Sequence, residues 1–192
     1  MSRADRLRWE RRWAGRGYDL GRPEPFLLRN LPFLLPGTVL DVAAGAGRNA
    51  LLLAARGFSV TALDISRIAI ARLRAQATAG GLTIRTRVGD LDDPACLCDL
   101  GTFDDLLVVR YKPSREQWRR LLTRLRPGGR LLLCSFGLED HAIHGTRPGH
   151  CLSRAELEAV FGGEMRLLLY ERFEQEGRRL EGSIWERRSG ED

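Results

Sequence analysis

One stretch of the sequence decides the fold of this chain: Val39-Leu40-Asp41-Val42-Ala43-Ala44-Gly45-Ala46-Gly47-Arg48-Asn49. It opens with an apolar run typical of a short strand over residues 38–43, and a helical pattern follows over residues 48–56. Small residues at the turn between them let the backbone approach a ligand and leave the amides of the helix N-terminus exposed. The stretch therefore predicts a strand–turn–helix unit that holds a ligand at its turn.

An acidic residue, Asp64, follows the next predicted strand, residues 58–63. In dinucleotide-binding folds an acid at this place accepts hydrogen bonds from ribose hydroxyls. The Gly45-Ala46-Gly47 pattern alone also fits a dehydrogenase or a tight turn, and the pairing with Asp64 strengthens the ligand-binding interpretation. A nicotinamide-binding turn would want a third glycine at the helix start, where this chain has Ala50.

Strand and helix patterns alternate along the rest of the chain. Further strands are expected over residues 82–88, 103–109 and 130–136, and helices over 5–14, 26–35, 66–79, 115–125 and 153–161. The runs 165–173 and 178–187 predict a terminal hairpin. This order predicts an α/β fold with a Rossmann-like, doubly wound, mostly parallel seven-stranded sheet and an antiparallel C-terminal hairpin strand.

The composition is that of an ordinary globular domain with an excess of positive charge. The chain has 31 Lys and Arg against 25 Asp and Glu, a formal net charge of +6. Because the arginines are spread along the chain and interleaved with acids, a nucleic-acid partner stays open but is not favoured. No apolar run reaches the length of a membrane span, so no membrane partner is expected. The four cysteines lack the spacing of metal ligands, and a reducing, cytoplasmic location is expected.

Several motifs together resemble those of class I S-adenosylmethionine-dependent methyltransferases. The segment 39–49 is similar to motif I of that family, and Val60-Thr61-Ala62-Leu63-Asp64-Ile65-Ser66 to the strand and acid that follow it. Gly89-Asp90-Leu91 is similar to the loop that holds adenine. Residues 125–131 are similar to the L-x-P-G-G turn before the fifth strand, and the terminal hairpin to the reversed seventh strand.

The resemblance implies S-adenosylmethionine as the cofactor and places Asp41 near its methionine end. Asp41 would lie near the amino group of the cofactor, directly or through water. Ala43, Gly45 and Gly47 would permit close backbone contact. Ala43 stands where the first motif glycine usually sits, and this departure leaves the Gly45-x-Gly47 core intact. For Asp41, an ion pair with a neighbouring arginine is the alternative.

The same resemblance assigns two further loops to the ribose and the adenine. Asp64 would accept hydrogen bonds from the ribose hydroxyls, with Ile65 against the adenine face. Asp90 would accept a hydrogen bond from the adenine amino group, with Leu91 packing nearby. For Asp90 the alternative is a role in the turn alone.

The residues after the fourth strand are the predicted catalytic, substrate-side pair. Arg110 and Tyr111 would face the transferring methyl group, and the alternative for Arg110 is an ion pair with Asp104, Asp105 or Glu116. This segment does not spell the Asn/Asp-Pro-Pro-aromatic motif of enzymes that methylate base amino groups. Methylation of base amino groups is therefore not favoured.

The N-terminal segment 9–18 is similar to the opening helix of small bacterial methyltransferases, including the tellurite-resistance and thiopurine methyltransferase groups. Trp13 and Tyr18 would close over the cofactor, whereas Trp9 is interpreted as packing the helix onto the domain.

A second segment, residues 136–151, carries His141, His144 and His150. Their spacing does not predict a helix-borne zinc pair, so no metal is expected and exposed loop positions are favoured.

These observations predict one methyltransferase domain over residues 1–192. Residues 1–37 would form a helical cover, 38–136 the cofactor-binding core, and 137–192 a substrate-side loop with the hairpin. The predicted reaction is in-line methyl transfer to a small-molecule nucleophile, such as a thiol or a chalcogen oxyanion. The alternatives are methylation of RNA or protein, and a non-catalytic cofactor-binding partner protein. The acceptor and the oligomeric state are left open.

Overall fold

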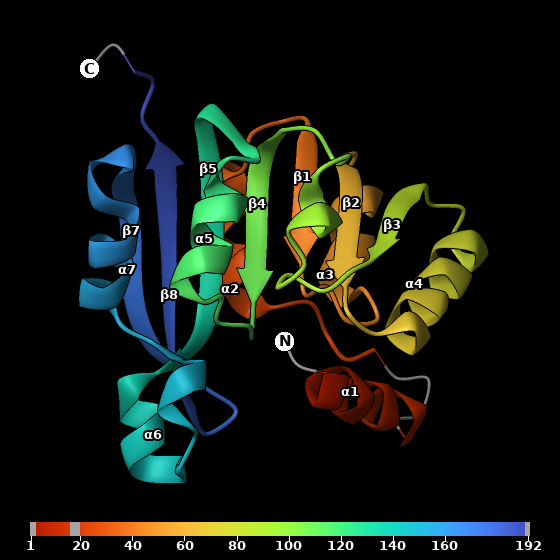
Figure 1. Ribbon diagram of the computed structural model, residues 1–192, viewed down its shortest axis with the longest axis horizontal. Helices are drawn as coiled ribbons and strands as arrows, with labels where there is room; N and C mark the ends of the chain where they lie inside the picture. Colours follow the sequence, from red (N-terminus) through yellow and green to blue (C-terminus); the bar gives the residue numbers. More distant parts are fainter. Residues whose placement is uncertain (1–2, 16–19, 191–192) are drawn as a thin grey trace.

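An eight-stranded sheet runs through the centre of the protein (Figure 1). The computed structural model describes residues 3–15 and 20–190. Seven strands form a path in the order β3-β2-β1-β4-β5-β8-β7, and β6 pairs with β5 beside that path. The strands are β1 (Thr38–Val42), β2 (Ser59–Asp64), β3 (Ile84–Val88), β4 (Phe103–Val109), β5 (Leu125–Gly137), β6 (Cys151–Leu152), β7 (Met165–Gln175) and β8 (Arg178–Arg187).

Strand direction places the functional loops at one edge of the sheet. Neighbouring strands from β3 to β5 run parallel, and β8 is antiparallel to β5 and to β7. The predicted Rossmann-like sheet with a reversed C-terminal strand is therefore confirmed. The short β6 is an addition, formed where the chain returns and pairs Cys151 with Phe136. The carboxyl ends of β1, β2, β4 and β5 thus meet at the same edge as the beginning of β8.

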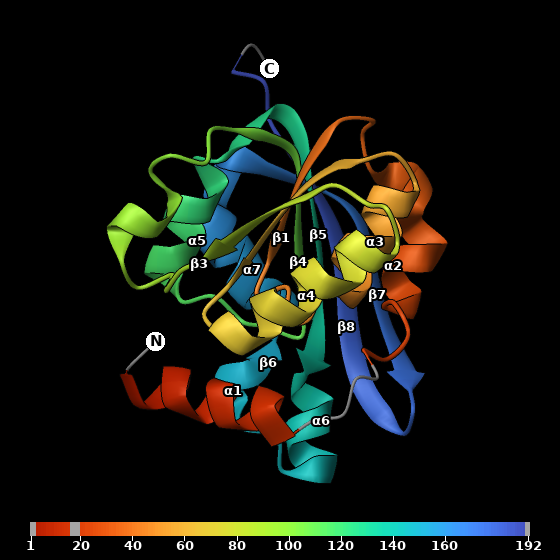
Figure 2. The ribbon, with the colours of Figure 1, turned by 90° about the vertical axis from the view of Figure 1, so that its right-hand side faces the viewer.

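Helices cover both faces of the sheet (Figure 2). The helices are α1 (Arg3–Gly15), α2 (Pro25–Asn30), α3 (Arg48–Ala55), α4 (Arg67–Ala79), α5 (Arg115–Leu122), α6 (Leu138–His144) and α7 (Arg154–Phe161). Buried side chains of α2, α3 and α4, such as Phe26, Leu53 and Leu73, form one apolar cluster. Trp118 of α5 and Phe161 of α7 belong to a second cluster on the opposite face. The two cores are built by the faces of the sheet and the helices that cover them. The loops at the carboxyl edge lie outside these cores and can therefore form a ligand-binding site.

The structure shows capping hydrogen bonds at the starts of two helices and a tight turn in the hairpin. The Ser66 side chain accepts a hydrogen bond from Ala69 N, 3.2 Å away, and so caps α4. Ser114 and Gln117 form a full capping box at α5. The β7–β8 turn places Glu176 and Gly177 at positive φ, which matches the right-handed twist of the two strands.

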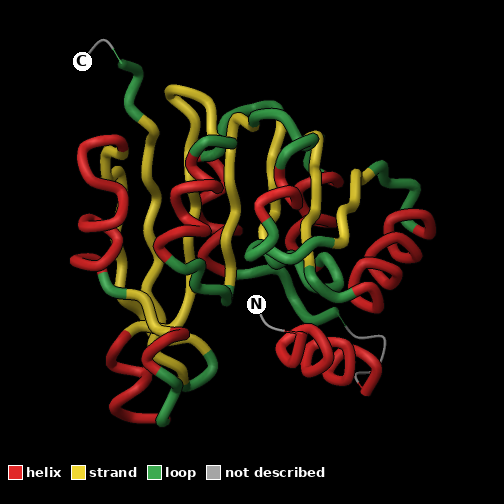
Figure 3. The backbone as a smooth tube through the Cα atoms, viewed as in Figure 1, coloured by secondary structure: helices red, strands yellow, loops and turns green. Residues whose placement is uncertain are grey.

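Three predicted segments differ from the structure. The helix expected over residues 115–125 ends at Leu122, and Leu125 already belongs to β5. The segment after β5, expected as a loop, contains helix α6, which is drawn red in Figure 3. The helix expected over residues 26–35 ends at Asn30 and continues as the 3₁₀ turn Leu31–Phe33, because Pro32 removes a helical amide donor. None of the helices in the described ranges combines the length and the apolar character that crossing a bilayer requires.

Candidate active site

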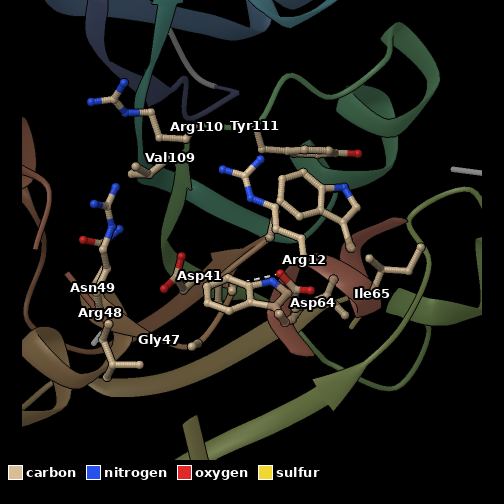
Figure 4. Close-up of a pocket in the computed structure, with 18 of the residues that line it drawn as sticks. Arg12, Asp41, Gly47, Arg48, Asn49, Asp64, Ile65, Val109, Arg110 and Tyr111 are labelled. Atoms are coloured by element: carbon tan, nitrogen blue, oxygen red, sulfur yellow. Dashed lines mark hydrogen bonds between the residues drawn. The ribbon is translucent and has the colours of Figure 1, made fainter. Parts of the chain in front are cut away.

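A cavity of about 670 Å³ lies at the carboxyl edge of the sheet (Figure 4). Its walls come from the turn after β1, the end of β2, the residues after β4, the end of β5 and the start of β8, with α1 along one side. Small-molecule and cofactor sites occupy roughly 300–1,000 Å³. In size and position the cavity therefore suits a ligand held by the loops that follow the strands.

The predicted glycine turn forms one wall of this cavity. Ala43, Gly45 and Gly47 adopt φ values of 55°, 58° and 89°, and all three line the cavity. Gly47 also precedes the first turn of α3, where a Cβ atom would lie 2.1 Å from Leu73 Cδ1. Only a residue without a Cβ fits there, which explains the glycine. Ala43 holds the same left-handed conformation at a cost of about 1 kcal/mol.

Asp64 ends β2 and is tied to the glycine turn. Its Oδ2 accepts a hydrogen bond from Gly45 N and its Oδ1 one from Ser66 N, each at 2.8 Å. Asp64 is 8% exposed, and burial raises the pKa of its carboxyl group. Asp64 lines the cavity, and each of its oxygens has lone-pair capacity beyond these bonds, so the group can accept hydrogen bonds from ligand hydroxyls.

Asp41 lies at the same end of the cavity as Asp64 (Figure 4). It is 1% exposed, and burial, followed by the charge of Asp64, raises its pKa to about 8. Within the described residues, Asp41 Oδ2 is buried without a hydrogen-bond partner. An orphaned buried acceptor costs free energy unless a donor meets it, so this atom fits the amino group of a bound cofactor.

The predicted adenine loop is only partly at the cavity. Ile65, Gly89 and Leu91 line it and offer an apolar surface of the kind that a base would contact. The Asp90 side chain is not among the lining groups, and its Oδ1 accepts a hydrogen bond from Asp92 N at 3.0 Å. This contact is the turn role considered as the alternative, and the contact of Asp90 with adenine stays a prediction.

Helix α1 covers the cavity with two tryptophans. Trp13 lies directly over Gly45, where a Cβ atom would be 2.7 Å from Trp13 Cζ2. Trp9, which we interpret from the sequence as a packing residue, also lines the cavity, and the guanidinium carbon of Arg12 lies 5.1 Å from its ring centre. The large ring of Trp9 can pack α1 onto the domain and also line the cavity. The sequence pattern does not show this second role. Tyr18 lies outside the described residues.

The predicted substrate-side pair separates into two environments. Arg110 lines the cavity at φ 56°, and its Nε donates to Glu24 Oε2 at 3.1 Å. Arg110 thus forms an ion pair, but with Glu24 rather than with Asp104, Asp105 or Glu116, and its place beside the transferring methyl group stays a prediction. Glu24 lies 86 positions away and reaches Arg110 only through the fold.

Tyr111 presents its ring to the cavity and turns its hydroxyl elsewhere. The hydroxyl donates to Gln117 Oε1 at 2.8 Å, and burial raises the pKa of Tyr111 above its usual value. The group is therefore protonated at neutral pH and does not act as a base there. Its part in positioning an acceptor stays a prediction.

The structure adds cavity residues that the sequence analysis did not single out. Phe136 of β5 and Arg178 of β8 line the cavity near the end of β4, and Arg48 of α3 pairs with Glu24 at 3.3 Å. Only the strand order β4-β5-β8 brings Phe136 and Arg178 beside the end of β4, and no spacing along the chain indicates it.

The histidine segment forms no metal site within the described residues. His141 and His144 lie on α6 rather than in a loop, and all three histidines are exposed. His141 Nδ1 lies 2.8 Å from the carbonyl oxygen of Thr146. Residues 3–15 and 20–190 contain no group of three or more His, Cys, Asp or Glu side chains placed to hold a metal ion.

Comparison with known proteins agrees with this geometry. Residues 39–129 match a family model described as a methyltransferase domain. This segment begins at β1, contains the turn and acids of the donor side, and ends inside β5. It does not include Phe136 or Arg178.

Solved structures share the fold along most of the chain. A protein studied for the conversion of a disulfide bond into a thioacetal group during echinomycin biosynthesis is 21% identical, with a TM-score of 0.74, over 95% of this chain and 92% of its own. TehB from Haemophilus influenzae is 17% identical, with a TM-score of 0.71, over 94% and 67%. An S-adenosylmethionine-dependent methyltransferase from Clostridium acetobutylicum is 13% identical, with a TM-score of 0.69, over 85% and 90%.

The domain match and the fold together define the class of protein to which this chain is similar. Residues 39–129 match a methyltransferase domain, and the chain has the Rossmann-like fold of solved methyltransferases, among them an S-adenosylmethionine-dependent one. The orphaned oxygen of Asp41 and the cradle of Gly45 and Gly47 fit that cofactor.

Proposed function

We propose that the protein methylates a small-molecule nucleophile, a thiol, an oxyanion or a similarly compact acceptor. The observation that carries this proposal is that helix α1 covers the cavity. Its residues Trp9, Arg12 and Trp13 line the cavity beside the glycine turn. The space of about 670 Å³ must hold both donor and acceptor. A covered cavity of this size favours a compact acceptor over a polymer surface.

The chain's own residues act by binding, orienting and excluding water. Bound S-adenosylmethionine would supply an electrophilic methyl group on a sulfonium, whose sulfur would keep the electron pair of the carbon–sulfur bond as the acceptor takes the methyl group. Asp41 and Asp64 would hold the amino group and the ribose. Trp13 would shield the donor from water, and Arg110 would hold the acceptor in line. No general base is needed when the acceptor is already an anion.

The other acceptor classes lack a specific observation in their favour. Many surface arginines are paired with acids, as in Arg126–Asp104, Arg166–Glu186 and Arg154–Glu158. Such pairing weakens the continuous basic face that an RNA substrate would need. The four cysteines are free thiols, which supports a reducing, cytoplasmic location as part of the proposal.

A turnover screen tests the proposal. The protein would be incubated with methyl-labelled S-adenosylmethionine and small thiols, selenite, tellurite, total RNA or mixed protein. Methyl incorporation into a small acceptor supports the proposal, and incorporation into RNA or protein alone contradicts it. Calorimetry with S-adenosylhomocysteine runs in parallel. Cofactor binding without transfer to any acceptor would favour the non-catalytic partner.

A further inference from the structure

Two arginines lie against one aromatic ring on the acceptor side of the cavity. The guanidinium carbons of Arg110 and Arg178 lie 5.0 Å and 4.5 Å from the ring centre of Phe136. All three side chains line the cavity. A cation on a ring face gains only a small stabilisation at an exposed site. That gain alone does not hold two like charges together, so other groups must fix them.

Each of the two arginines forms an ion pair with a buried carboxylate. The Glu24 side chain is fully buried and accepts from Arg110 Nε at 3.1 Å. The Asp140 side chain is also fully buried, and it accepts from Arg178 Nε at 3.0 Å and from Arg178 Nη2 at 2.6 Å. Hydrogen bonds from Arg178 hold the pKa of Asp140 well below its usual value. The two guanidiniums are therefore fixed in position before any ligand arrives.

These contacts leave part of each guanidinium available to a ligand. Among the described residues, the hydrogen bonds of Arg110 use only Nε, and those of Arg178 only Nε and Nη2. Glu24 is shared with Arg48, so three guanidiniums pair with two buried carboxylates, which leaves one positive charge in excess among these five groups. The other buried acids of the cavity, Asp41 and Asp64, lie at the glycine turn. Glu176 also lines the cavity, but it is exposed and its charge is screened by solvent.

We propose that Arg110, Phe136 and Arg178 bind the carboxylate of a small organic methyl acceptor. This inference rests on the proposed function and narrows its substrate class. A guanidinium presents parallel N–H donors that match the two oxygens of a carboxylate, and the ring of Phe136 with Leu20 offers apolar surface to the rest of the molecule. Arg110 keeps a left-handed backbone at φ 56°, a strain that is found preferentially at functional positions.

Equilibrium binding without turnover tests the inference. Phenylacetate and its neutral amide, phenylacetamide, have nearly the same shape and differ in charge, so they serve as probes in the presence of saturating S-adenosylhomocysteine. We expect the wild type to prefer phenylacetate at least tenfold by calorimetry or ligand-observed NMR. Arg110→Gln should reduce phenylacetate affinity at least fivefold, and so should Arg178→Gln. Selenite is titrated as a second anion.

Controls separate a lost subsite from a lost fold. Arg126→Gln removes one charge and one ion pair outside the cavity and should leave both affinities unchanged. Arg178→Gln leaves the buried Asp140 without its ion-pair partner. Phe136→Leu is therefore a second variant, which keeps the charges of both Arg110 and Arg178 and should weaken phenylacetate binding. Retained S-adenosylhomocysteine affinity shows that each variant is folded.

The outcomes distinguish this inference from the proposed function. Equal binding of phenylacetate and phenylacetamide, an unchanged Arg110→Gln, or binding of selenite without phenylacetate would overturn the carboxylate site while the methyltransferase function stands. Failure of the wild type to bind S-adenosylhomocysteine would instead overturn the donor site on which the proposed function rests.

Discussion

The hydroxyl of Ser66 donates a hydrogen bond to the carboxylate of Glu10, 3.0 Å away, and joins the cover helix α1 to the start of α4. The same carboxylate accepts from the backbone amide of Arg67 at 2.8 Å. A carboxylate at a helix N-terminus is stabilised by the exposed amides and the helix dipole. Since Ser66 lies two residues after Asp64, this contact fixes the cover directly beside the predicted ribose contact.

We expect Glu10→Ala to loosen α1. A carboxylate in this position contributes about 0.3–1 kcal/mol at the surface and up to about 2 kcal/mol when partly buried. The dissociation constant for S-adenosylhomocysteine should therefore rise severalfold, and acrylamide should quench the tryptophan fluorescence more strongly. Glu158→Ala removes an exposed acid that pairs within α7 and should change neither quantity. Equal quenching in Glu10→Ala and the wild type would show that Glu10 does not hold the cover.

The pKa of Asp41 predicts a pH-dependent affinity. Because that pKa is raised to about 8, the ligand-free carboxyl group is mostly protonated at pH 6.5. A cationic amino group favours the ionised form, so ligand binding should release a proton below pH 8. Affinity for S-adenosylhomocysteine should then rise by up to about tenfold per pH unit between pH 6 and 7.5.

Calorimetry in buffers of different ionisation enthalpy measures the released proton directly. Asp41→Asn should bind more weakly and lose most of this pH dependence, whereas Asp99→Asn, at an exposed ion pair with Arg87, should keep it. A wild-type affinity that is flat over this range would place the amino group elsewhere.

The donor side could be predicted from the sequence because its parts are local. The turn from Ala43 to Gly47 and the acid Asp64 each belong to one strand–loop unit, and the parallel order brings the two units together. Even on the donor side, the contact of Glu10 with Ser66 could not be predicted. The sequence shows a glutamate among the arginines of α1 and does not indicate which residue it contacts.

The acceptor side could not be predicted in the same way, because it is assembled from distant segments. Arg110 follows the end of β4, Phe136 lies on the neighbouring strand β5, Arg178 begins a reversed strand, and Glu24 precedes α2. The hairpin was predicted, but its pairing of Leu180 with Phe136, which sets Arg178 over the ring, is fixed by tertiary packing.

Gly47 should not tolerate a side chain. Gly47→Ala combines a left-handed φ of 89° with a Cβ atom 2.1 Å from the buried Leu73 Cδ1. Gly81→Ala is a matched control, since its φ is 63° but nothing lies within 4 Å of the added carbon. We expect Gly81→Ala to lower the free energy of unfolding by about 1–2 kcal/mol through backbone strain alone. Gly47→Ala should lose about 1–3 kcal/mol more through overpacking.

Denaturant unfolding of the two variants measures this difference. Gly47→Ala should also weaken S-adenosylhomocysteine binding, because the amides at the start of α3 must shift, whereas Gly81→Ala should bind normally. Equal stability of the two variants would mean that Leu73 can move aside and that close packing is not the reason for this glycine.

Trp13 should report cofactor binding. Its ring lies over Gly45 in the cavity, so a ligand placed against the glycine turn must displace the indole or stack on it. Titration with S-adenosylhomocysteine should therefore change the tryptophan emission of the wild type. The change should largely disappear in Trp13→Phe and persist in Trp118→Phe, because Trp118 is 2% exposed in the core between α5 and α7. Trp13→Phe should also bind several-fold more weakly, since a smaller ring covers less of the donor. An emission change that Trp13→Phe retains in full would show that the ligand does not meet the cover at Gly45.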